Sequence, residues 1–338
     1  MEERKQAILK AVVQEFTETA LPVGSRMLAS RHFLTVSPAT IRGELAELSE
    51  AGYLIQPHTS AGRVPSDSGY RYFVDFLMGA EAVPRRVRAY IEAELRNTPL
   101  DLQTLVERAA MTIATVTQNA SVVSAPHGPQ ARIKHVDLVS LEPAAVLLIL
   151  LLGGNLLRQQ VTTISRETSQ EDLSRLASAI NGSLAGKDRE HVRGQMEKLA
   201  PGTELEILIR IQEVLEQFER GSEALVVHDG VRNLLKQPEF SETARLQEVL
   251  EVLEESRQLS AVLREMVGDS DLQMAIGSEN ATDQLRGCTI VVTTYGPPGG
   301  IKGTMGVVGP TRMRYGQTVG RLRVVARAAS DRMAELHA

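Results

Sequence analysis

Residues 37–52 spell SPATIRGELAELSEAG, which is the pattern of a short amphipathic helix with a marked start and end. Ser37 is a favourable N-cap, and Pro38 fits the first helical position because the amide that proline lacks has no partner there. Three apolar residues at helical spacing form a stripe for burial: Ile41, Leu45 and Leu48. Gly52 is the type of residue that commonly follows a helix end. The sequence therefore predicts a helix with one buried and one polar face.

The sequence before residue 37 predicts two further helices. The first has an apolar face at helical spacing: Ile8, Leu9, Val12, Val13 and Phe16. Pro22–Gly24 then breaks the chain, and Ser25 is expected to cap a second helix that extends to Phe33.

The sequence after Gly52 predicts a hairpin. Tyr53–Gln56 is a short strand candidate, and His58–Gly62 is a turn that leads into a return strand from Arg63. Residues 69–78 have a helical pattern again. Three helices followed by a hairpin is the order of a winged helix-turn-helix, whose third helix enters the major groove while the wing contacts the DNA backbone.

This order predicts DNA-contacting residues on the second helix, the third helix and the wing. They are Ser25, Ser37, Pro38, Ala39, Thr40, Arg42, Gly43, His58, Thr59, Ser60 and Arg63. Small residues at the start of the third helix let its backbone approach DNA, and Arg42 is expected to contact guanine or phosphate. Arg63 is expected to contact phosphate. An alternative remains open for each part. The third helix would be a capped structural helix that binds no ligand, and the wing would be a turn that contacts only solvent.

Charge alone does not indicate a nucleic-acid partner. The chain has 338 residues and a formal net charge of −5, and residues 1–78 contain eight Lys and Arg against nine Asp and Glu. This balance excludes a protein that coats DNA by charge, but it is compatible with a dimeric reader of specific sequences. We therefore expect weak non-specific binding.

Several other classes of protein are disfavoured. The single Cys288 excludes an intrachain disulfide and a cysteine-based zinc finger, and the seven histidines show no metal-ligand spacing. Residues 296–304 lack the phosphate-loop pattern and predict a hairpin loop, and no nucleophile motif occurs. The nine-residue apolar run 144–152 is too short to span a membrane, and no secretory pattern begins the sequence. We expect a cytoplasmic, non-enzymatic protein without a cofactor or metal.

The rest of the chain alternates between strand-rich and helical parts. Strand patterns cover 133–141, 145–152 and 156–164, with Gly153–Asn155 as a hairpin turn, and further strands cover 288–295 and 301–308. Between these parts, residues 203–220 and 241–267 predict two long amphipathic helices. Their apolar stripe either packs within its own domain or meets a second subunit. The alternation suggests one domain split by an insertion.

Several motifs resemble one bacterial family over nearly the whole chain. They are PVGS at 22–25, SPATIR at 37–42, GYL at 52–54, QPHTSAGRVP at 56–65, DSGYRYFVD at 67–75, LLKQPEF at 234–240 and VVGPTRMRY at 307–315. They are similar to the heat-inducible transcription repressor HrcA family. Gly43 stands where that family usually has asparagine, and glycine weakens a helix by about 1 kcal/mol relative to alanine.

The resemblance implies an α+β multidomain protein with a winged-helix domain and a GAF-like domain that is split by an inserted, mainly helical dimerising domain. With the patterns above, we expect the winged-helix domain at 1–80, a linker helix at 81–100, the GAF-like domain at 101–202 and 269–338, and the insertion at 203–268. The resemblance also implies a homodimer that binds an inverted-repeat operator of chaperone operons and is kept active by the GroEL chaperonin. The alternative is a ligand-sensing regulator with a small-molecule site among the GAF-like strands.

Overall fold

The computed structural model describes most of the chain. Described are residues 1–58, 61–79, 81–126, 132–142, 144–152, 156–224, 226–241, 243–254, 263, 266, 271–297 and 302–336. The chain is a mixed α/β protein that divides into two compact units. The first unit comprises Met1–Ser124, Val226–Tyr295 and Thr304–Arg332, and the second is mainly Ala125–Leu225.

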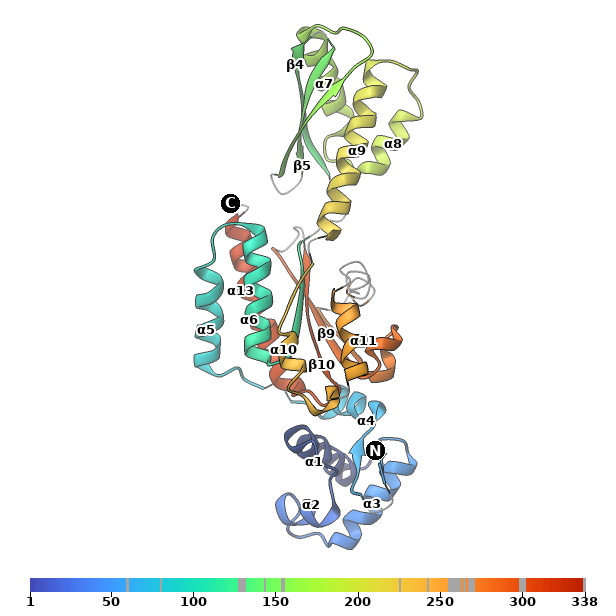
Figure 1. Cartoon of the computed structure of the whole chain (residues 1–338), viewed down its shortest axis with the longest axis vertical. Helices are drawn as coiled ribbons and strands as arrows, with labels where there is room; N and C mark the ends of the chain where they lie inside the picture. The colour runs from blue at the N-terminus through green and yellow to red at the C-terminus, as the bar shows by residue number, and fades with distance from the viewer. Residues whose placement is uncertain are drawn as a thin grey trace. The chain divides into compact units, whose positions relative to one another are not determined.

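The first 78 residues, called here the N-terminal segment, form helices and a small hairpin (Figure 1). The elements are α1 (Glu3–Thr19), α2 (Ser25–Arg31), α3 (Pro38–Glu50), β1 (Leu54–Ile55), β2 (Val64–Pro65), α4 (Asp67–Tyr72) and the π-helix η1 (Phe73–Leu77). The predicted apolar stripes of α1 and α3 are buried, apart from the half-buried Phe16. Gly52 follows α3 with φ of +81°, a left-handed conformation that glycine adopts without strain.

The rest of the first unit is built on a five-stranded sheet in the order β7-β3-β10-β9-β8. Its strands are β3 (Ala120–Ser124), β7 (Val226–Asp229), β8 (Leu272–Ile276), β9 (Cys288–Tyr295) and β10 (Gly303–Pro310). Its helices are α5 (Arg85–Arg96), α6 (Leu102–Thr117), α10 (Val231–Leu234), α11 (Thr243–Glu254) and α13 (Tyr315–Leu336), with short 3-10 turns η3 (Pro238–Phe240), η4 (Gly277–Glu279) and η5 (Asp283–Leu285). Residues of α11 share a buried core with β3, β9 and β10, and α5, α6 and α13 lie on the opposite side of the sheet (Figure 1).

The second unit has its own sheet and its own core. Its elements are β4 (Ile133–Glu142), β5 (Ala145–Leu152), β6 (Leu156–Thr163), α7 (Gln170–Leu184), α8 (Arg189–Met196) and α9 (Thr203–Ala224). The three strands are antiparallel, and β5 alternates between fully and partly buried residues. Side chains of all three helices pack on the fully buried face of the sheet. The predicted hairpin turn Gly153–Asn155 lies outside the described residues, although Leu152 and Leu156 on either side of it are paired.

The unit boundaries differ from the domain boundaries expected from sequence. The insertion was expected at residues 203–268, whereas the second unit starts at Ala125 and contains β4, β5 and β6. Of the two long helices, α9 packs on the three-stranded sheet and α11 on the five-stranded sheet. Amphipathic patterns show that each helix has a buried face, but not which sheet receives it, so the expected bounds of the insertion stay a prediction. The expected linker helix is α5, whose Ile91 and Leu95 are fully buried.

Candidate nucleic-acid interface

The start of α3 presents a continuous exposed face. Ser37 is the N-cap, and its hydroxyl accepts a hydrogen bond from the Thr40 amide at 3.1 Å. Pro38 occupies the first turn, as predicted. The predicted site residues of this helix are all exposed: Ser37, Pro38, Ala39, Thr40, Arg42 and Gly43. Because Ile41, Leu45 and Leu48 point into the core, these exposed residues share the surface that is free to meet a ligand.

The segment between α1 and α2 pairs with the hairpin through one antiparallel bridge, between Val23 and Arg63. Leu54 pairs with Pro65 and Ile55 with Val64 in β1 and β2. The Val23 amide also donates to the Arg63 carbonyl at 2.8 Å, and the Arg63 amide donates to the Val23 carbonyl at 2.9 Å. A Cβ on Gly62 would lie 2.4 Å from the Val23 carbonyl oxygen, so this close pairing requires glycine.

The predicted wing residues differ in their surroundings. His58 is exposed, and Arg63 is half-buried with its Nε lacking a hydrogen-bond partner among the described residues. Thr59 and Ser60 lie outside the described residues. Arg63 therefore lies at the base of the hairpin, with its backbone held by Val23 and its Nε unsatisfied.

The prediction that Ser25 caps α2 is wrong. Gly24 is the N-cap, no side-chain cap forms, and Ser25 is the first helical residue and is buried. The helix ends at Arg31 rather than Phe33. The side chain of Ser25 is consequently poorly exposed to a ligand.

Two ion pairs between α1 and α3 were not predicted from the sequence. Arg4 binds Glu44, and the Lys5 ammonium lies 2.8 Å from the Glu47 carboxylate. The hydrogen bond to Glu47 raises the pKa of Lys5. Glu44 follows Ile41 by three residues, and a carboxylate beside a buried stripe signals a paired charge, but sequence does not identify the partner.

Contacts between α4 and the end of β8 connect the N-terminal segment to the five-stranded sheet within the first unit. Nε of Arg71 donates to Oε1 of Glu279 at 2.8 Å, and Nη2 of Arg71 donates to the Met274 carbonyl at 2.9 Å. The Ser278 amide donates to the Asp67 carboxylate at 2.8 Å. These contacts restrain the orientation of α4, which directly follows the hairpin.

We expect this connection to weaken in acid. Partial burial by itself would raise the pKa of Glu279, but the hydrogen bonds from Arg71 and the Ile276 amide outweigh burial and hold the pKa below its usual value. Such a carboxylate stabilises the fold above its unfolded pKa of about 4.3, and the contribution is lost as pH falls through the folded pKa. The urea midpoint of the wild type should exceed that of Glu279→Gln at neutral pH, and the difference should close in acid. A difference independent of pH would contradict this assignment.

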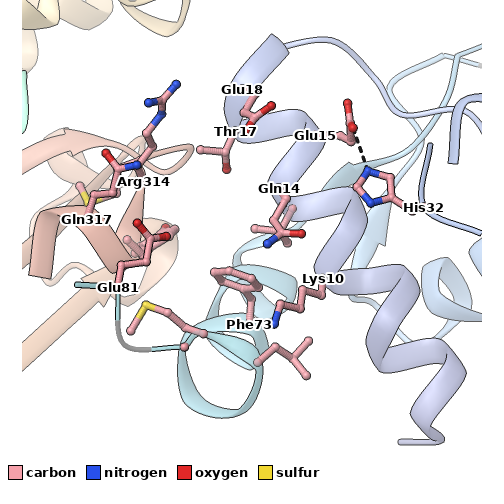
Figure 2. Close-up of a pocket in the computed structure, with 17 residues that line it drawn as sticks. Lys10, Gln14, Glu15, Thr17, Glu18, His32, Phe73, Glu81, Arg314 and Gln317 are labelled. Atoms are coloured by element: carbon pink, nitrogen blue, oxygen red, sulfur yellow. Dashed lines mark hydrogen bonds and ion pairs between the residues drawn. The ribbon is translucent and has the colours of Figure 1, made fainter. Parts of the chain in front are cut away.

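A cavity of about 470 Å³ lies in the first unit between α1, η1 and the start of α13. Figure 2 shows Lys10, Gln14 and Glu18 on α1 facing the wall that carries Glu81 and Arg314. Both charge signs line the cavity, and its lining residues belong to no strand. The expected small-molecule site among strands therefore stays a prediction. Within the described ranges there is no group of three potential metal ligands, and no helix long and apolar enough to cross a membrane.

Comparisons with known proteins place the chain in the class of transcription repressors. It is 38% identical over 342 residues to the heat-inducible transcription repressor HrcA of Roseiflexus castenholzii, covering 99% of this chain and 95% of the relative. It is 35% identical to the repressor of the same name from Herpetosiphon aurantiacus, covering 100% of this chain and 96% of the relative. The family model described as HrcA protein C terminal domain matches residues 103–319.

The chain belongs to the heat-inducible transcription repressor HrcA family, which confirms the resemblance found in the sequence. Among solved structures, it is similar to a hypothetical protein whose crystal structure was determined at 2.2 Å resolution. The TM-score is 0.63 at 19% sequence identity, and 99% of each chain is covered. That likeness concerns the fold alone.

Proposed function

We propose that the chain is a cytoplasmic repressor that binds an inverted-repeat operator of chaperone operons as a homodimer, through a winged-helix domain formed by the N-terminal segment. The observation that carries the proposal is the capped, exposed start of α3 beside a hairpin joined to Val23. In this arrangement α3 enters the major groove and the hairpin contacts the backbone. The five-stranded sheet with its helices would be the split GAF-like domain, interrupted by the second unit.

Substitution of two arginines tests this proposal. If Arg42 contacts a guanine, Arg42→Ala should lose about 1–3 kcal/mol of binding to the inverted repeat and relax the preference at one base pair per half-site. Arg63→Ala should weaken binding to all sequences alike and reduce the salt slope by about 0.9 for each phosphate that is no longer neutralised. Titrations against a selected inverted repeat and a scrambled duplex, over a range of salt concentrations, measure both effects. Unchanged affinity in both variants contradicts the assignment of helix and wing.

The outer face of the three-stranded sheet supports the homodimer. Along each strand, residues that point to this outer face alternate with residues that point into the core. The apolar residues of the outer face are Val139, Leu147, Ile149, Leu151, Leu157 and Val161. Leu147 pairs with Val161 and Leu151 with Leu157, so these side chains form neighbouring rows. Val161 is 60% exposed and Leu157 is 50% exposed. Such a patch on a sheet is typical of a subunit interface, and two-fold symmetry would pair it with the same patch of a second copy.

Sheet topology supports dependence on the GroEL chaperonin. Strand β3 pairs with β7 and β10, which come from distant parts of the sequence, and pairing of this kind folds slowly while apolar strands are exposed. We expect the denatured chain to regain operator binding in higher yield with the chaperonin and ATP than without them. The same experiment with bovine serum albumin controls for non-specific protection. Equal recovery with both proteins would remove this part of the proposal.

A further inference from the structure

We propose that Glu44, bound to Arg4, is a positioning residue that fixes how α3 is presented to DNA and keeps Arg4 away from phosphate. The inference rests on the proposed function, because it assumes that α3 meets DNA. It concerns two residues that lie outside the predicted set of DNA contacts.

The geometry of the Glu44–Arg4 pair is unusual for a surface helix. Glu44 is only 6% exposed, its Oε1 accepts a hydrogen bond from Arg4 Nε at 2.6 Å, and Arg4 Nη2 forms an ion pair with the same oxygen at 2.5 Å. The other oxygen, Oε2, is buried and has no hydrogen-bond partner among the described residues. A buried carboxylate with one oxygen unsatisfied opposes folding, so burial alone does not account for glutamate at this position.

The position of Glu44 in α3 suggests what the contact does. Glu44 directly follows Gly43, and it lies one helical turn after Thr40 in the exposed first turn. Glycine at position 43 lowers the intrinsic preference of this region for helix. The hydrogen bond and the ion pair from Arg4 fix the helix at Glu44, the next residue, and thereby the direction in which Arg42 projects.

The contact with Glu44 also neutralises the positive charge of Arg4. Arg4 remains 55% exposed although its guanidinium is bound to Glu44, so a freed Arg4 would be available to neutralise a phosphate. Release of Arg4 should therefore strengthen binding to any duplex while weakening discrimination between sequences. The Lys5–Glu47 pair offers a matched comparison, because Glu47 is 59% exposed and lies on the surface.

The experiment uses the full chain and an inverted-repeat duplex that the wild type selects from a random library, with a scrambled duplex of equal length. For Glu44→Gln we expect the affinity ratio between the two duplexes to fall about tenfold, which corresponds to one misplaced base contact. The salt slope on the scrambled duplex should steepen by about 0.9, since one more cation is free to bind phosphate. Glu47→Gln should leave the ratio unchanged and steepen the slope less, because the Lys5 ammonium also lies 3.5 Å from the Glu2 carboxylate.

The controls separate positioning from folding. Thermal melting identifies variants that remain folded, and a folded Glu44→Gln protein with wild-type ratio and slope overturns the inference. If Glu44→Gln does not fold, Arg4→Lys decides, because lysine keeps the charge but cannot reproduce the paired Nε and Nη2 contacts. The Arg4→Lys variant should show a smaller affinity ratio between the selected and the scrambled duplex than the wild type. A ratio equal to that of the wild type overturns the inference. If the wild type selects no duplex, the proposed function itself fails, which is a different result from a selected duplex with an unaffected Glu44 variant.

Discussion

Replacing Leu147 and Val161 together with glutamate should convert the proposed dimer to a monomer and weaken binding to the inverted repeat by roughly 10²–10⁴-fold. The two residues are paired across β5 and β6 on the outer face of the three-stranded sheet. In the proposed dimer this change places four like charges within one apolar interface, where they cannot be solvated. In that proposed dimer the second DNA-binding segment would meet its half-site at high effective concentration, and this advantage would disappear when the subunits separate.

Light scattering gives the mass of the particle in solution, and titration with full-site and half-site duplexes gives the loss of avidity. Affinity for a single half-site should not change, since both substitutions are remote in sequence from α3. Ala179→Glu is the matched control, because Ala179 is an exposed residue of α7, which covers the other face of the same sheet. A double variant that remains dimeric would show that the subunits associate elsewhere.

Local signals in the sequence predicted the elements of the candidate interface well. The cap at Ser37, the proline at the first turn and the apolar stripe of α3 depend on residues within one or two helical turns of each other, and all three are confirmed. The predicted cap of α2 was wrong by one residue because glycine and serine are both accepted at that position.

Contacts between distant residues were not predictable from the same patterns. Arg4 and Glu44 are 40 positions apart, and nothing local in either segment indicates the other. The pairing of Val23 with Arg63 likewise depends on how the hairpin packs against the segment between α1 and α2. The division into two units was not predictable for a related reason, since an alternating strand pattern does not specify which sheet a strand joins.

Gly69→Ala should destabilise the N-terminal segment locally by about 3 kcal/mol and weaken DNA binding as a result. A Cβ on Gly69 would lie 2.1 Å from the carbonyl oxygen of Tyr53. That oxygen is held by the Ser66 amide at 3.1 Å, and the Ser66 hydroxyl donates to the Gly52 carbonyl at 2.6 Å. The clash therefore falls on backbone atoms fixed at both ends of the hairpin, which cannot move without breaking these hydrogen bonds.

Hydrogen exchange measured on peptides of α1 and α3 reports this segment separately from the rest of the chain, and it should become about 100-fold faster in Gly69→Ala. Gly43→Ala is a control that we expect to stabilise its helix rather than destabilise it. Nothing lies within 4 Å of a Cβ at position 43, so alanine adds helix preference of about 1 kcal/mol without a clash and should slow exchange in α3. Because both changes add one methyl group to a helix, a result in which they act alike would mean that the Tyr53 carbonyl does not constrain position 69.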